Sequence, residues 1–233
     1  MMTDRMTRRA TLGMAGAMAL AGSTAFGGQT STSKPVKILG IACSPREGKT
    51  TATAVKTALE AAKAVDSRIA VELLDLGGLE ISGWAGGSKP GEAAPIEDDF
   101  DLLVPKLRDE AVGGWIVGSP VYFRSMSALC KAFLERCAVL RKPTLLLADK
   151  PVGVLAVGAY RNGGQELVID QIQTALLCHE MMIVGGKPRA HQGATLWNAY
   201  DDDITKDEFG MDTAKKLGIR VAEAALKLRP AKP

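Results

Sequence analysis

The sequence predicts a doubly wound α/β domain, with a five-stranded parallel sheet and helices on both faces. Short apolar and β-branched runs alternate with segments of helical periodicity from residue 36 to the end of the chain. Several of these runs are apolar throughout, which is typical of strands that are covered by helices on both faces of a parallel sheet. Right-handed crossovers leave few other ways to pack five strands and five helices in alternation.

The elements follow one another in a regular order. The expected strands are 36–42, 69–76, 112–118, 151–157 and 181–186. A continuous apolar stripe from Met126 to Leu140 predicts the clearest helix. The other helices are expected around Val55–Ala62, Phe100–Leu107, 165–179 and 211–228. In such folds ligands bind outside the carboxyl ends of the strands, so the loops that follow the strands are the place to look for a site.

The first 33 residues differ from the rest of the chain. They have a basic start, a middle rich in Ala, Gly, Leu and Met, and small residues near Ala21, which is the layout of a signal peptide rather than a membrane anchor. Arg8 and Arg9 resemble a twin-arginine export signal, and an ordinary secretory signal or an amphipathic tail are the alternatives. We therefore expect a signal and polar tether over 1–33, a single domain over 34–233, a periplasmic or exported location, and no stable membrane insertion.

Composition excludes some partners and sites. The 29 basic and 26 acidic residues nearly balance and form no basic block, so we expect no nucleic-acid partner. The four cysteines, at 43, 130, 137 and 178, form neither a C-x-x-C pair nor a cluster with histidine, so no metal site is expected. Cys130 and Cys137 fall on the apolar stripe of a predicted helix and are expected to be buried thiols.

The stretch "CSPREGKTT", residues 43–51, lies between the first strand and the first helix and permits three chemistries. A nucleotide-triphosphate P-loop needs a glycine at the position of Cys43, where a side chain would obstruct the turn. Asp75, at a strand end, would be that site's magnesium ligand. A cysteine-phosphatase loop needs an arginine at Lys49, because an ammonium cannot hold a phosphoryl group bidentately, and it also uses an Asp-Pro pair that this chain lacks.

The third chemistry is a flavin phosphate loop, which requires fewer specific residues in the loop than the other two. A phosphate binds to amides and hydroxyls at a helix N-terminus with help from the macrodipole. Ser44, Thr50 and Thr51 supply hydroxyls here, and Arg46 and Lys49 supply positive charge. Serine and threonine are also ordinary helix caps, so the loop alone does not decide between the three chemistries.

Two later segments are more specific. "SPVYF" follows the third strand and "GAYRNGGQE" follows the fourth. In this order behind "CSPREGKTT", they resemble the NADPH-dependent FMN reductase family, which has a flavodoxin-like fold. The resemblance extends over most of residues 36–228.

This resemblance implies a cofactor and the residues that hold it. The FMN phosphate would lie on Ser44, Arg46, Thr50 and Thr51. The isoalloxazine ring would meet the backbone of one loop, Pro120, Val121, Tyr122 and Phe123, and of a second, Gly158, Ala159, Tyr160, Arg161, Asn162, Gly163 and Gly164. Because FMN carries the chemistry, no catalytic side chain is expected.

The resemblance also implies the reaction and the partners. The chain would take a hydride from NADH or NADPH and reduce a flavin, a quinone or another small acceptor, as a homodimer or homotetramer. The alternative is an exported flavodoxin-like electron carrier that a protein partner reduces. Relatives known as iron–sulfur flavoproteins carry a cysteine cluster after the second strand, but the corresponding loop here, 77–99, contains no cysteine, so no cluster is expected.

Overall fold

The structure is a computed structural model that describes residues 35–84 and 97–229. The predicted signal peptide, and the part of the 77–99 loop between 85 and 96, lie outside these residues. Among the helices described, none combines the length and the apolar character that a membrane span requires.

A parallel sheet with the order β2-β1-β3-β4-β5 forms the middle layer of the domain, and β6 also pairs with β4. The strands are β1 (Val36–Ala42), β2 (Ile69–Asp75), β3 (Val112–Pro120), β4 (Pro151–Gly158), β5 (Met182–Ile183) and β6 (Ala194–Trp197). Every pairing between these strands is parallel. The predicted fold class is therefore confirmed.

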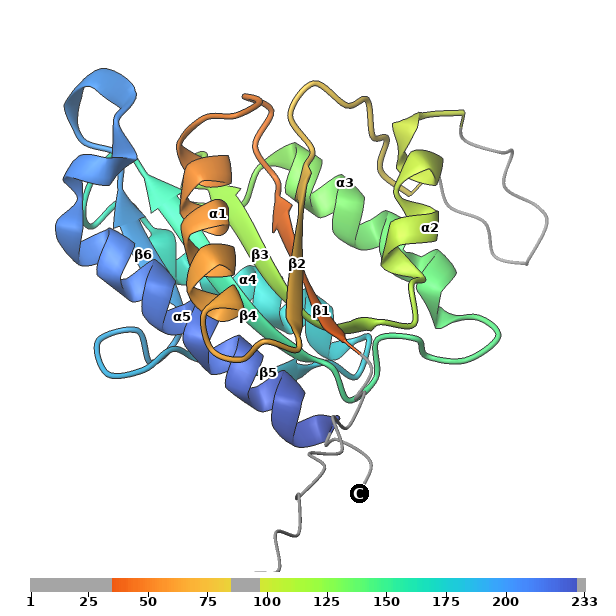
Figure 1. The fold of residues 1–233 in the computed structure, drawn as a ribbon. Helices are drawn as coiled ribbons and strands as arrows, with labels where there is room; N and C mark the ends of the chain where they lie inside the picture. Colours follow the sequence, from red (N-terminus) through yellow and green to blue (C-terminus); the bar gives the residue numbers. More distant parts are fainter. Residues whose placement is uncertain (1–34, 85–96, 230–233) are drawn as a thin grey trace, which may run out of the picture. The chain divides into compact units, whose positions relative to one another are not determined.

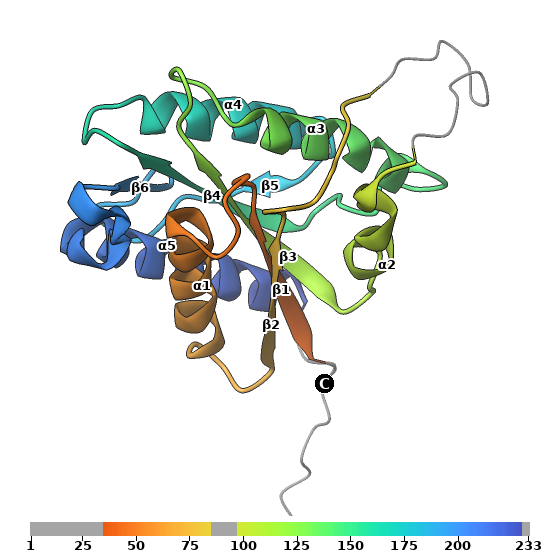
Figure 2. The ribbon, with the colours of Figure 1, turned by 90° about the horizontal axis from the view of Figure 1, so that it is seen from above.

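Helices cover both faces of the sheet (Figures 1 and 2). They are α1 (Thr50–Lys63), α2 (Val104–Leu107), α3 (Ala128–Arg136), α4 (Gln165–Leu177) and α5 (Glu208–Leu228). Helices α1 and α5 pack on one face, and α3 and α4 pack on the other, as Figure 2 shows most clearly. Short 3₁₀ turns are present at Asp99–Leu102, Cys137–Arg141, Tyr200–Asp202 and Ile204–Lys206.

The alternation of side chains along β1 explains why its sequence is apolar apart from Lys37, near its start. Leu39 and Ile41 enter the core on the side of α3, where Phe133 packs. Ile38 enters the other core, which also contains Val55 of α1. Burial of each such Leu or Ile side chain stabilises the fold by roughly 1.5–3 kcal/mol. Because the side chains on both faces of the strand are buried, apolar residues are favoured on both faces.

The fifth strand position is filled by two short strands, and the sequence predicted only the first of them. β5 pairs with the start of β4, through Pro151 and Met182, whereas β6 pairs with its end, where Gly158 aligns with Trp197. β6 has four residues inside a polar, irregular stretch, so its periodicity is too short to detect. It brings a further loop to the carboxyl edge of the sheet.

The predicted helices are present with changed ends. The stripe from Met126 to Leu140 forms α3 and then a 3₁₀ turn that begins at Cys137, although Leu140 remains fully buried. The last helix begins at Glu208, three residues before its predicted start.

Candidate functional site

Three loops meet where the neighbouring strands β1, β3 and β4 end. The Cys43 amide donates to the Gly118 carbonyl at 2.7 Å, and the Val121 amide donates to the Val157 carbonyl at 2.8 Å. Gly164, with φ of 109°, packs so closely that a Cβ there would lie 3.2 Å from the Cα of Arg124. The predicted phosphate loop and the two predicted ring loops therefore form one continuous edge.

The loop after β1 gathers the predicted phosphate ligands. Ser44, Thr50 and Thr51 are buried, whereas Arg46 and Lys49 are exposed. Ser44 Oγ accepts from the Arg46 amide at 3.2 Å, and Arg46 Nη2 lies 3.5 Å from Thr50 Oγ1. The guanidinium of Arg46 thus lies near the first residue of α1 without a close contact to it.

The N-terminus of α1 is suited to an anion. Lys49 occupies the N-cap position, and no side chain within the described ranges caps the helix there. By contrast, Ser127 caps α3 by accepting from the Cys130 amide at 3.0 Å. The first turn of α1 carries no acidic residue, so its free amides and its macrodipole favour a negatively charged ligand.

Asp75 holds this loop in place. Its Oδ2 accepts from the Gly48 amide at 2.7 Å, and its Oδ1 accepts from the Gly77 amide at 3.1 Å. The loop lies so close to the end of β2 that a Cβ on Gly77 would come within 2.3 Å of Glu47 Cα. Both oxygens of Asp75 are engaged by backbone amides, which makes it a support for the loop rather than a magnesium ligand.

Cys43 faces the core and is fully buried. Burial raises the pKa of its thiol well above the ordinary value, and a hydrogen bond with Cys130 raises it further. A nucleophilic cysteine needs a lowered pKa and access to substrate, so this position does not support the cysteine-phosphatase interpretation. Cys43 thus belongs to the core and not to the exposed surface of the loop.

The loop after β3 is a tight turn that exposes two aromatic rings. Tyr122 and Ser125 exchange backbone hydrogen bonds of 2.9 Å. Between them, Phe123 and Arg124 have φ of 50° and 62°, in the left-handed region that costs about 1–3 kcal/mol for such residues. Tyr122 is half-exposed and Phe123 is fully exposed. The turn thus presents flat apolar surfaces at the edge where the ring is expected.

The loop after β4 is shaped by Gln165, which lies in the motif "GAYRNGGQE" but was not predicted to belong to the site. Its Oε1 accepts from the Gly163 amide at 2.9 Å. Its Nε2 donates to the carbonyls of Tyr160 at 2.6 Å and Leu196 at 3.2 Å. Because Gln165 is buried, these bonds fix the backbone between 160 and 163.

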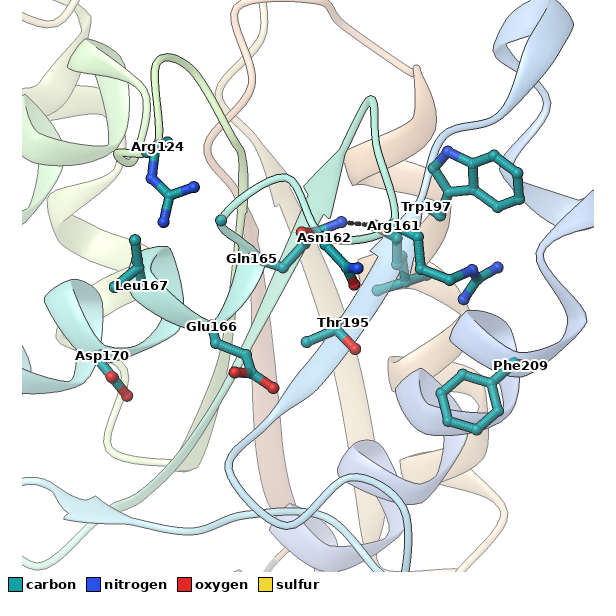
Figure 3. Close-up of a pocket in the computed structure, with 12 residues that line it drawn as sticks. Arg124, Arg161, Asn162, Gln165, Glu166, Leu167, Asp170, Thr195, Trp197 and Phe209 are labelled. Carbon is teal, nitrogen blue, oxygen red and sulfur yellow. Dashed lines mark hydrogen bonds between the residues drawn. The ribbon is translucent and has the colours of Figure 1, made fainter.

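Arg161 turns away from the turn after β3. It pairs with the buried carboxylate of Asp207 at 3.0 Å and lies over the ring of Trp197, 4.7 Å from its centroid. Figure 3 shows Arg161 and Trp197 at one end of a pocket of about 560 Å³, with Arg124 and Leu167 at the other end. The side chain of Arg161 therefore belongs to this outer pocket, while its backbone belongs to the loop that is predicted to meet the ring.

The loop between β6 and α5 adds residues that sequence reasoning missed. Asp202 Oδ2 accepts from Arg46 Nη1 at 2.8 Å, and Asp202 Oδ1 accepts from Asn198 Nδ2 at 2.8 Å. The only sequence signal was the acidic run "DDD" in an irregular region. Its proximity to the phosphate loop follows from β6, which was not predicted.

The described residues contain no group of three or more His, Cys, Asp or Glu side chains that could hold a metal ion. Cys43, Cys130 and Cys137 are buried in the core, and the exposed Cys178 follows the end of α4. Since α4 starts at the carboxyl edge of the sheet and runs back along it, Cys178 and Cys43 lie at opposite ends of the sheet.

A doubly wound parallel sheet whose loops after β1, β3 and β4 meet at the carboxyl edge defines the flavodoxin-like class of proteins. The chain matches the NADPH-dependent FMN reductase family over residues 36–195. It therefore belongs to that family of flavodoxin-like, FMN-binding oxidoreductases.

Relatives agree with this assignment. An iron–sulfur flavoprotein of Methanocaldococcus jannaschii is 38% identical over 191 residues, which cover 81% of this chain and 96% of that protein. An iron–sulfur flavoprotein of Methanosarcina thermophila is 33% identical and covers 78% of this chain and 93% of its own length.

Solved structures agree on the fold. RosB with bound 8-demethyl-8-formylriboflavin-5'-phosphate matches with a TM-score of 0.65 at 15% identity, over 83% of this chain and 80% of that chain. A WrbA-like flavodoxin of Agrobacterium tumefaciens matches with a TM-score of 0.55 at 16% identity, over 83% and 99% of the two chains.

Proposed function

We propose that this chain is an FMN-dependent oxidoreductase that takes a hydride from NADH or NADPH and passes electrons to a flavin, a quinone or another small acceptor. The observation that carries the proposal is the start of α1. Uncapped amides, a buried hydroxyl and two basic side chains meet there, beside the loops that follow β3 and β4. A phosphate on one side and a flat ring on the other fit this combination.

The phosphate end is assigned to Ser44, Arg46, Thr50 and Thr51. A phosphate monoester carries a charge of about −1.5 to −2 at neutral pH and accepts several hydrogen bonds. The α1 amides and the Thr50 hydroxyl would supply neutral donors, and Arg46 would supply a bidentate, charge-assisted one.

The ring end is assigned to the backbone of 120–123 and 158–164. Bound FMN supplies the ring that accepts and donates the hydride. Rigid backbone groups suit a ring whose edge carries both donors and acceptors. The bonds of Gln165 and the hydrogen-bonded turn of Tyr122 and Ser125 hold these two loops in place before any ligand arrives.

Several parts of the proposal rest on sequence patterns alone. We propose export through the twin-arginine pathway, a periplasmic location, and a homodimer or homotetramer. A periplasm contains little nicotinamide, so the second candidate function is a flavodoxin-like carrier that a protein partner reduces. The basic character of the chain, with a sequence pI near 8.6, favours the enzyme, because carriers of this fold tend to be acidic.

We also propose that the chain works without the iron–sulfur cluster for which its relatives are named. Its four cysteines lie at positions 43, 130, 137 and 178, and the loop from 77 to 99 has none. Iron and acid-labile sulfide assays on anaerobically purified protein should find neither in stoichiometric amount, and a visible charge-transfer band from a cluster would contradict this.

The first test is the absorbance spectrum of the purified protein. A yellow protein that releases FMN on denaturation supports the proposal, and a colourless protein that cannot be reconstituted with FMN would end it. Steady-state oxidation of NADH and NADPH then separates the two candidates. Turnover with a quinone or free flavin supports the enzyme, whereas reduction only by a protein partner supports the carrier.

The phosphate assignment has its own test. Replacing both Arg46 and Thr50 with Ala should weaken binding of FMN but leave riboflavin, which has no phosphate, nearly unchanged. An equal loss for both ligands would contradict the assignment.

A further inference from the structure

The loop between β6 and α5 places a carboxylate against the phosphate loop. Asp202 pairs with Arg46 at 2.8 Å, and its second oxygen accepts from Asn198 at 2.8 Å. In contrast, the distance from Arg46 Nη2 to Thr50 Oγ1 is 3.5 Å, at the long limit for a hydrogen bond. The firm contact of the guanidinium is therefore with Asp202 and not with the start of α1.

The carboxylate of Asp202 interacts with both positive charges of the loop after β1, those of Arg46 and Lys49. The pKa of its carboxyl is lowered first by the hydrogen bond with Arg46, then by that with Asn198, and further by the charges of Arg46 and Lys49. Asp202 is thus ionised at neutral pH. The two basic groups that would attract a phosphate already have an anion of the chain beside them.

We propose that Asp202 is an internal competitor of the FMN phosphate, which engages Arg46 in the free protein and limits the affinity for FMN. This inference rests on the proposed function, because it assumes that the α1 site takes FMN. On binding, the phosphate takes over Arg46, and Asp202 loses its ion pair.

The charge of the ligand determines whether Asp202 competes with it for Arg46 or supports its binding by orienting Arg46. A carboxylate that merely orients an arginine is useful next to a neutral ligand or a weakly charged one. Beside a group with a charge of about −2, the same carboxylate adds like-charge repulsion and also withholds the guanidinium. Both effects lower the affinity for FMN and leave riboflavin unaffected. Asp202 is therefore a determinant of the preference between the two flavins.

The backbone offers a clean variant and a matched control. Asp201 and Asp202 both have positive φ, of 66° and 57°. Asparagine tolerates this conformation as well as aspartate does, so Asp202→Asn removes the charge without disturbing the turn. Asp201→Asn makes the same change one residue away, where the side chain is 79% exposed and lies 3.5 Å from Lys206.

The experiment is a fluorescence titration of the flavin-free full-length chain with FMN and with riboflavin. We expect Asp202→Asn to tighten FMN by about tenfold, as expected for loss of a nearby like charge in a partly exposed site, with riboflavin unchanged. Asp201→Asn should leave both affinities unchanged. In an Arg46→Gln background the gain should be smaller, because only the like-charge repulsion remains when Asp202 has no guanidinium to withhold.

The outcomes are distinguishable. If the parent chain binds neither flavin, the proposed function fails and the inference fails with it. If the parent chain binds FMN but Asp202→Asn binds it equally well or more weakly, only the inference is overturned. A weaker affinity would show that Asp202 orients Arg46 for the phosphate instead of competing with it. Unfolding curves of each variant confirm that the fold is intact.

Discussion

The Asp75 carboxylate accepts a hydrogen bond of 2.7 Å from the Gly48 amide, so the end of β2 holds the loop that carries the predicted phosphate ligands. The other Asp75 oxygen accepts from the Gly77 amide at 3.1 Å. One side chain therefore joins two loops through its two oxygens. Asp75 can therefore influence ligand binding through the position of the loop, without touching the ligand itself.

Replacing Asp75 with Asn should weaken both the loop and the binding of FMN. Asparagine has a single acceptor oxygen, and its NH₂ group would face the N–H of Gly48 or Gly77. Loss of one such bond to a charged group costs about 1.5–3 kcal/mol, and we expect a decrease of that order in the free energy of unfolding, measured by urea denaturation. FMN affinity, measured by titration, should fall several-fold more than riboflavin affinity.

Asp66→Asn is the control for this change. Asp66 also accepts from a backbone amide, that of Arg68 at 2.9 Å, but it precedes β2 at the opposite end of the strand. The control should lose stability without a change in FMN affinity. If Asp75→Asn destabilised the chain and bound FMN normally, the loop would not depend on Asp75.

Gln165→Glu should affect the ring end of the site. The glutamate can still accept from the Gly163 amide, but it brings an oxygen instead of an NH₂ group to the carbonyls of Tyr160 and Leu196. An unsatisfied buried group of this kind costs about 1–3 kcal/mol, which the loop would avoid by moving. The affinities for FMN and for riboflavin should therefore fall to the same degree, and the visible spectrum of the bound flavin should shift.

The neighbouring Glu166→Gln provides the control, because Glu166 is exposed and, among the residues that the structure describes, accepts from Gln192 alone, at 2.8 Å. It should retain both affinities. A Gln165→Glu variant that lost FMN but kept riboflavin would place this loop at the phosphate and contradict its assignment to the ring.

The sequence predicted the sheet because local pattern and tertiary position agree there. Strand β4 is apolar throughout and β1 is apolar apart from Lys37, since both faces of each strand are buried, and the runs 151–157 and 36–42 match them within one residue. The loops after these strands were located by the same logic. Cys43 faces the core because it continues the alternation of Leu39 and Ile41 along the strand.

The missed features depend on contacts that no local pattern contains. β6 is a strand because its backbone pairs with β4, and its four residues are too few for their alternation to be recognised in the sequence. Asp202 is 156 residues from Arg46, and only this pairing brings the two together. Gln165 belongs to the motif that follows the fourth strand, but its three bonds, two within that loop and one to Leu196 of β6, form only when the backbone of both segments is in place.

The lowered pKa of Lys150, which lies far from the site, predicts that the free energy of unfolding depends on pH. It precedes β4, at the end of the strand opposite the ligand loops. Burial, and then the charge of Arg229, lower its pKa from 10.5 to about 8, although Asp109 opposes this. Between these two pH values the unfolded chain binds more protons than the folded chain, so the contribution of Lys150 to the free energy of unfolding rises with pH.

Lys150→Met should therefore raise the melting temperature near neutral pH, where burial of the charged lysine is unfavourable. The gain should shrink as the pH rises through about 8 towards 10.5, because the folded lysine is then neutral. Melting curves across this range measure the effect. The exposed Lys142→Met is the control and should show no such trend. A gain that stays constant with pH would contradict the lowered pKa.

Thiol labelling tests the interior beneath the phosphate loop. Cys43, Cys130 and Cys137 are fully buried, and burial raises the pKa of Cys43 and Cys137. Thiolates react with maleimide and thiols hardly do, so the folded chain should label rapidly at Cys178 alone, and the unfolded chain at all four cysteines. Cys178→Ser should abolish the rapid phase. Mass spectrometry of the labelled peptides identifies the site, and rapid labelling of Cys43 in the folded chain would restore it as a candidate nucleophile.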